Sequence, residues 1–124
     1  MTSNFIWLMI AIYFEARNQP LDVQVLIGHS VMTRTLKREI SVKQVCAEKG
    51  QFPWYKKLKN GKLIIDDVAS LIRAADAAFK VQAERMDGIY FDADFFYSDD
   101  ISPPYWAKVF EPRGKYGAFY FFKS

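Results

Sequence analysis

The chain has 124 residues, of which 51% are hydrophobic and 17% aromatic, and this composition predicts one compact domain over residues 1–124. It has a net charge of +3, a single cysteine, Cys46, and a single histidine, His29. One cysteine excludes an internal disulfide, and one histidine provides too few ligands for a zinc site. We therefore expect no metal and no other cofactor.

The chain opens on an apolar run at residues 5–14. Hydrophobic side chains recur there at helical spacing, and the positions between them are also apolar, which predicts a helix buried on most sides. The run is too short to span a bilayer, and it lacks the basic flank and cleavage site of a secretory signal. We expect synthesis in the cytoplasm and no stable insertion into a membrane.

Glu15 is the only charged side chain in the first sixteen residues. In the last turn of the predicted helix, loss of water and the negative end of the helix dipole both raise its pKa towards the range of a general acid. On these residues alone, a carboxylate turned to solvent or paired with a distant lysine or arginine is the simpler interpretation.

The next two helices are marked by their first residues. Pro20 suits the first turn of a helix that reaches about Lys37, and Ser41 suits the N-cap of a short third helix. Gly50 and Pro53 then predict a loop. Exposed aromatic residues in loops often serve binding, and this loop carries Phe52, Trp54 and Tyr55.

A turn is expected at residues 59–62. Asp66 or Asp67 is then expected to cap the fourth helix, which ends before Gly88. Extended structure is expected at 89–98, a loop at 103–106 and a terminal strand at 117–122. Helices first and strands last describe a helix-rich α+β domain. The apolar stripe expected on the fourth helix is Val68, Leu71, Ile72, Ala75 and Phe79.

The charges are distributed unevenly, with basic residues crowding positions 34–62 and acidic residues gathering at 87–100. This pattern suits an anionic polymer bound beside carboxylates, and ordinary solvated faces explain it equally well. Aromatic side chains alternating with carboxylates also suit a sugar polymer, whose rings stack on flat apolar faces. A second catalytic carboxylate stays open among Asp92, Asp94, Asp99 and Asp100.

Several motifs resemble the SleB-like cell-wall hydrolases, the family of the spore-cortex-lytic enzymes. Residues 12–20 read Ile-Tyr-Phe-Glu-Ala-Arg-Asn-Gln-Pro and resemble the family signature Tyr-Gly-Glu-Ala-Arg-Gly-Glu-Pro. Residues 23–34 are similar to the helix that follows it. Residues 50–54 resemble Gly-Gln-Phe-Ser-Trp, residues 102–107 resemble Pro-x-Trp-Ala, and Gly117 with Phe121 matches the closing glycine and aromatic. These motifs occur in the family's order.

The resemblance implies a lysozyme-like fold and cleavage of peptidoglycan glycan strands between N-acetylmuramic acid and N-acetylglucosamine, by a muramidase or lytic transglycosylase. It implies Glu15 as the catalytic acid, and the transglycosylase chemistry requires no second carboxylate. We expect Arg17 to shape the site or to form a plain ion pair. Gln51 is expected to bond an acetamido group or to fix its own loop, and Tyr97 and Trp106 to stack on sugar rings or to pack in the core. The full set of expected substrate contacts is Arg17, Gln51, Phe52, Trp54, Asp94, Tyr97 and Trp106.

The chain departs from the family pattern at three places. Gln19 stands at the second glutamate, and residues 94–97 and 117–119 lack the histidines that the family carries there. A mechanism that needs those groups does not transfer to this chain. The Glu-Ala-Arg core at residues 15–17 is intact, which favours an active enzyme.

Two other classes of function compete with the enzyme. A non-catalytic module would bind glycan in the same cleft without turnover. A nucleic-acid-binding domain would use the central lysines and aromatic residues, but the acidic C-terminal third would repel a phosphate backbone. We expect a monomer that binds peptidoglycan, binds no nucleic acid, and reaches the wall as a phage-type lysin released by a holin or carried in a virion.

Overall fold

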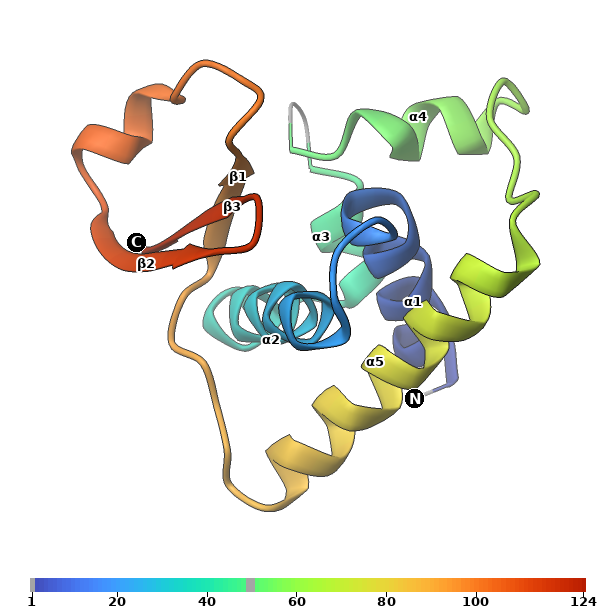
Figure 1. The fold of residues 1–124 in the computed structure, drawn as a ribbon, viewed down its shortest axis with the longest axis horizontal. Helices are drawn as coiled ribbons and strands as arrows, with labels where there is room; N and C mark the ends of the chain where they lie inside the picture. The colour runs from blue at the N-terminus through green and yellow to red at the C-terminus, as the bar shows by residue number, and fades with distance from the viewer. Residues whose placement is uncertain (1, 49–50) are drawn as a thin grey trace.

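The computed structural model describes residues 2–48 and 51–124, and the helix break expected at Gly50 lies outside these ranges. Within these ranges, five α-helices precede a three-stranded sheet, as expected for a helix-rich α+β fold. In Figure 1 the helices and the sheet form two sides of the molecule, and α2 contacts β1 where they meet. The elements are α1 (Thr2–Ala16), α2 (Leu21–Arg38), α3 (Val42–Cys46), α4 (Pro53–Lys59), α5 (Val68–Met86), β1 (Phe95–Ser98), the 3-10 helix η1 (Tyr105–Lys108), β2 (Glu111–Tyr116) and β3 (Phe119–Lys123).

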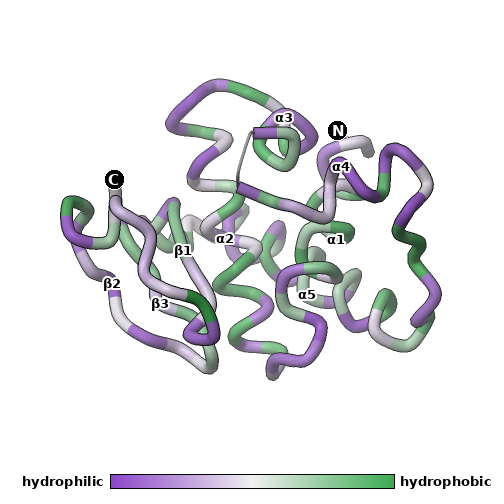
Figure 2. The backbone as a smooth tube through the Cα atoms, turned by 90° about the horizontal axis from the view of Figure 1, so that it is seen from above, coloured by the Kyte–Doolittle hydropathy of each residue, from purple (hydrophilic) through white to green (hydrophobic). Residues whose placement is uncertain are grey.

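The predicted buried helix is α1, and it lies at the centre of the helical side. Leu8, Ala11, Ile12 and Tyr13 are fully buried, and α1 packs against α2, α3 and α5. Figure 2 shows mostly hydrophobic colour along α1 and mixed, more hydrophilic colour along β2. Among the described residues, no helix has the length and hydropathy needed to cross a bilayer.

The predicted start of α3 is confirmed in detail. The Ser41 side chain accepts a hydrogen bond from the Gln44 backbone N–H, and the Gln44 side chain accepts one from the Ser41 backbone N–H. This reciprocal cap satisfies two donors that a helix start leaves unpaired. The capping residue and the three that follow it are sufficient to specify such a local feature.

The loop expected from Pro53 to Tyr55 is wrong, because these residues begin α4. Pro53 occupies the first helical turn, where its missing N–H is not needed, so it starts a helix instead of breaking one. Phe52 and Trp54 are buried rather than exposed. The Trp54 ring stacks on the Phe14 ring at a centroid distance of 5.1 Å, so packing against α1 holds this short helix.

Asp67, one of the two expected capping residues, caps α5. The predicted apolar stripe is right for Leu71, which packs against the core, and wrong for three other members. Val68, Ile72 and Phe79 are 67%, 57% and 62% exposed. The face turned to the core instead carries small side chains, which let α5 lie close to α1 and α2. A Cβ placed at Gly28 of α2 would lie only 2.7 Å from Val81 Cγ2. The buried residues of α5 are Ser70, Ala74, Ala77, Ala78 and Val81.

The sheet is antiparallel with strand order β1-β3-β2. The expected terminal strand is its central strand, β3, while only residues 95–98 of the expected extended segment form a strand. The edge strand β2 was not expected, because Pro112 and Gly114 interrupt its pattern, and the pairing with β3 shifts register between them. The inner face of β1 and β3 adds Phe96, Phe119 and Phe121 to the main core.

Candidate active site

A cleft of about 390 Å³ opens between the helical side and the sheet. The last turn of α1, the segment leading into α4, the end of β1 and the start of β3 each contribute to its wall. Three of the expected site residues, Glu15, Gln51 and Tyr97, meet here. The complete lining is Glu15, Gln51, Pro53, Phe96, Tyr97, Ser98, Asp100, Ile101 and Phe119.

Glu15 stands at the wall of this cleft, in the last turn of α1 as expected. Its Oε2 accepts a hydrogen bond of 2.8 Å from the indole Nε1–H of Trp54. In the part of the chain that the structure describes, the carboxyl group forms no ion pair. The ion-paired form of the simpler interpretation is therefore wrong, and the side chain is half-buried rather than fully turned to solvent.

Burial raises the pKa of Glu15 from its ordinary 4.5 to about 7. Two weaker effects lower this pKa, the hydrogen bond from Trp54 and the positive charge of Arg34. Loss of water outweighs both, because a carboxylate surrounded by protein loses more hydration than one donor and a nearby cation replace. Near neutral pH the group exists in both protonation states, which suits a residue that donates a proton and later takes one back.

Arg34 is a site residue that the sequence analysis missed. It is 1% exposed, and its Nε donates to the Asp94 carbonyl oxygen at 2.8 Å. Its Nη1 donates to Gln51 Oε1 at 3.3 Å, and its guanidinium lies 4.1 Å from the centre of the Phe95 ring. Arg34 thereby holds Gln51 at the cleft. A signal was present, since Arg34 continues the apolar positions 27 and 31 of α2 at helical spacing.

Of the four aspartates left open as a second carboxylate, Asp100 is the one that lines the cleft. Its Oδ1 accepts a hydrogen bond from the Ser98 hydroxyl. The others are engaged elsewhere in ion pairs, namely Asp92 with Arg113, Asp94 with Lys37 and Asp99 with Lys115.

Asp94, an expected substrate contact, is 2% exposed and does not line the cleft. It accepts hydrogen bonds from the Ser124 backbone N–H at 2.8 Å and from Lys37 Nζ at 3.0 Å. Burial alone would raise the pKa of Asp94, but the hydrogen bonds from Ser124 and the charged Lys37 outweigh it and keep the pKa below its usual value. Its position ties the end of the chain to α2.

Arg17, Phe52, Trp54 and Trp106 also lie outside the lining of the cleft. Arg17 donates to the Tyr13 hydroxyl at 2.7 Å, and Phe52 packs between Trp54 and Phe96. Trp54 reaches the site through its bond to Glu15. Trp106 is 7% exposed and belongs to a small separate cluster with Phe95 and Phe122.

Gln19, which stands where the SleB-like signature has its second glutamate, contacts the sheet. Its Oε1 accepts a hydrogen bond of 3.1 Å from the Ala118 backbone N–H, in the turn between β2 and β3. Gly117 of this turn has φ +56°, and a Cβ there would lie 2.4 Å from the same oxygen. The close approach requires glycine and fixes the sheet against the end of α1.

Cysteine and histidine each occur once in the chain. In the described ranges, no group of three His, Cys, Asp or Glu side chains is placed to hold a metal ion. Cys46 is a buried free thiol, and burial raises its pKa to about 12. His29 is buried in α2, and its Nε2 lies 2.8 Å from Glu84 Oε1 of α5. Both residues lie outside the lining of the cleft.

Comparison with known proteins identifies the fold. No protein-family model matches the chain, and no curated protein matches it significantly. Among solved structures, the catalytic domain of the Bacillus cereus SleB protein matches with a TM-score of 0.64 and 19% sequence identity, over 98% of this chain and 91% of that one. The chain has a SleB-like fold. The lysozyme-like α+β architecture expected from the sequence is thereby confirmed.

Proposed function

We propose that the protein cleaves the glycan strand of peptidoglycan between N-acetylmuramic acid and N-acetylglucosamine, with Glu15 as general acid and then base. The observation that carries the proposal is the protonatable carboxyl of Glu15, whose pKa of about 7 is set by burial at the wall of an open cleft. The SleB-like fold supports the same reading. Phe96, Tyr97 and Phe119 add aromatic surface for sugar rings.

In the proposed reaction, protonated Glu15 transfers its proton to the bridging glycosidic oxygen as the bond to the muramyl C1 breaks. The indole N–H of Trp54 occupies Oε2, so the transferable proton sits on Oε1. If the muramyl 6-hydroxyl attacks C1, Glu15 then takes its proton and the product is an anhydro sugar. If water attacks in inverting hydrolysis, a second carboxylate takes its proton and the product is a reducing sugar.

A substitution of Asp100 is the change in the cleft best suited to distinguish formation of an anhydro sugar from hydrolysis. In inverting hydrolysis a second carboxylate holds the attacking water, whereas ring closure by the 6-hydroxyl needs none. Mass spectrometry of the released muropeptides distinguishes anhydro from reducing ends. If wild type releases anhydro products, we expect Asp100→Asn to leave the product pattern and the rate nearly unchanged. If wild type releases reducing ends with Asp100 as the base, Asp100→Asn should reduce the rate of hydrolysis roughly a hundredfold.

The test of the proposal is the loss of turbidity of a purified murein suspension. Wild-type protein should clear the suspension, and Glu15→Gln should abolish clearing while glycan binding in a sedimentation assay is retained. Gln is matched in size and accepts the same Trp54 hydrogen bond. A wild-type protein that sediments with murein but never clears it is a glycan-binding module, and an active Glu15→Gln variant removes Glu15 from the mechanism.

A further inference from the structure

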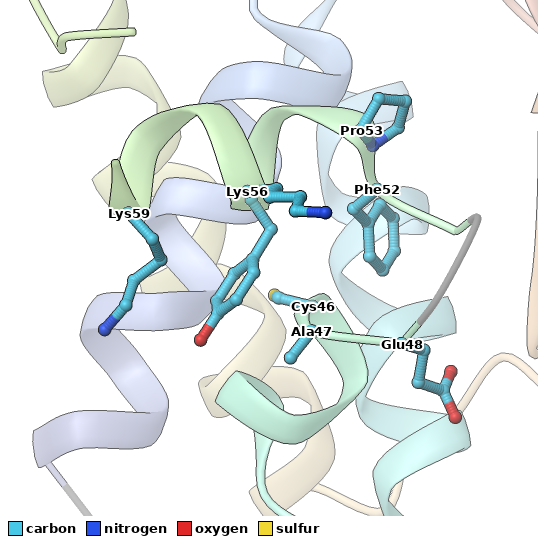
Figure 3. Close-up of a pocket in the computed structure, with 8 residues that line it drawn as sticks. Cys46, Ala47, Glu48, Phe52, Pro53, Lys56 and Lys59 are labelled. Atoms are coloured by element: carbon cyan, nitrogen blue, oxygen red, sulfur yellow. The ribbon is translucent and has the colours of Figure 1, made fainter. Parts of the chain in front are cut away.

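A second pocket of about 580 Å³ adjoins the cleft (Figure 3). It lies between the end of α3 and one side of α4, and we refer to it as the α3–α4 pocket. Pro53 lines both this pocket and the cleft, so one proline separates them. The lining is Cys46, Ala47, Glu48, Phe52, Pro53, Tyr55, Lys56 and Lys59.

The pocket combines an apolar floor with a positively charged rim. Cys46 and Phe52 are buried and supply the floor, whereas Lys56 and Lys59 are exposed on α4. Figure 3 shows the Lys56 side chain extending towards Phe52 across the pocket. Neither lysine forms an ion pair with any residue in ranges 2–48 and 51–124. Both ammonium groups are therefore available to a ligand.

Glu48, the acidic residue in the lining, does not cancel this charge. Its carboxylate pairs with Arg38, and Arg34 Nη1 lies 3.6 Å from its Oε1. In Figure 3 its carboxylate points away from Lys56. The pocket thus presents net positive charge over an apolar surface, which fits a ligand with carboxylates and short aliphatic side chains.

We propose that the α3–α4 pocket binds the carboxylate-bearing peptide stem of peptidoglycan while the glycan occupies the cleft. The inference rests on the proposed function, because it places two parts of one substrate in two adjoining sites. In peptidoglycan the stem peptide is attached to the lactyl group of muramic acid, so it begins beside the glycan strand. Pro53 alone is shared by the linings of the pocket and the cleft, so the two sites adjoin. Lys56 and Lys59 pair with stem carboxylates, and Phe52 contacts alanine methyl groups.

The experiment is an NMR titration of the Glu15→Gln protein with a synthetic stem tetrapeptide of L-alanine, γ-D-glutamate, diaminopimelate and D-alanine. We expect amide shifts at Cys46, Phe52 and Lys56. Lys56→Glu should weaken binding roughly tenfold, the loss expected for one charge-assisted contact. The matched control Lys57→Glu changes an exposed lysine of α4 outside the lining and should stay within about twofold.

Two further measurements separate this inference from the proposed function. The same peptide with its carboxylates amidated should not bind, and added salt should weaken binding of the free peptide. When released saccharides are counted by mass spectrometry, wild type should cleave stem-bearing glycan faster than glycan stripped of its stems, and Lys56→Glu should erase that preference. Equal binding of the amidated peptide, or an absence of shifts in α3 and α4, overturns the pocket assignment even where wild type clears murein. Failure to clear murein contradicts the proposed function instead.

Discussion

At the scale of single residues, the chemistry of the cleft depends on opposing effects on one carboxyl group. Burial raises the pKa of Glu15 to about 7, while Trp54 and Arg34 lower it. A general acid must be protonated to act, so activity is present below this pKa and lost as pH rises through it. Burial therefore moves the alkaline limb of the activity profile to higher pH, and the hydrogen bond from Trp54 moves it part of the way back.

Trp54→Phe tests this relation. It removes the indole N–H but keeps an aromatic ring against Phe14, so the pKa of Glu15 should rise and the alkaline limb should move to higher pH. The measurements are the pH profile of murein clearing and an NMR titration of the Glu15 carboxyl carbon. Trp7→Phe, in a half-buried tryptophan of α1 that packs on Tyr55, is the matched control and should shift neither. A limb that moves to lower pH contradicts the assignment.

At the scale of elements, the helical side depends on small residues where helices cross. Gly28 of α2 faces Val81 of α5 and Ile12 of α1, and a Cβ there would lie 2.7 Å from Val81 Cγ2 and 3.1 Å from Ile12 Cδ1. Valine is stiff at its first side-chain torsion, so it cannot turn away cheaply. Small residues line this crossing, while Val68, Ile72 and Phe79 of α5 are exposed, where the sequence pattern did not place them.

Gly28→Ala should reduce the free energy of unfolding by about 1–3 kcal/mol through overpacking, measured by urea denaturation. Val81→Ala should destabilise the protein by a cavity of its own. Since each change relieves the other, the double variant should be less destabilised than the sum of the two single variants. Strict additivity would show that the two residues do not meet.

At the scale of the whole molecule, the cleft requires the sheet to stay docked on the helices. Asp94 provides part of this connection, because it joins Ser124 at the end of the chain to Lys37 of α2. Arg34 adds a bond from α2 to the Asp94 carbonyl oxygen, and Gln19 holds the turn that precedes β3. The two sides of the cleft are thus fixed by buried polar contacts between distant parts of the chain.

Asp94→Ala should reduce the free energy of unfolding by about 1–3 kcal/mol at neutral pH, because it leaves the Ser124 N–H without its acceptor and removes the ion pair with Lys37. The pKa of Asp94 is lowered in the fold, so its contribution is present above the unfolded pKa and lost as pH falls through the folded one. The difference between wild type and variant should therefore shrink in acid. Asp92→Ala, in an exposed pair with Arg113, is the control and should leave the urea midpoint nearly unchanged.

The sequence alone was sufficient for features that neighbouring residues decide. The helix with Glu15 in its last turn, the Ser41 cap, a cap at Asp66 or Asp67 and the final strand all follow from local hydrophobic spacing or capping chemistry. The position of Glu15 in a final helical turn followed from the same spacing, and the order of the motifs pointed to the SleB-like fold. Such features need only a few consecutive residues, so they can be read without tertiary contacts.

Tertiary contacts decided the features that depend on pairs of residues far apart along the chain. Trp54 is a buried donor to Glu15 because α4 packs on α1, Arg34 is a site residue because α2 meets the sheet, and Asp100 lines the cleft because β1 ends there. The exposed face of α5 depends on how that helix packs against α1 and α2. None of these has a local signature, since each depends on which segments, far apart along the chain, the fold brings into contact.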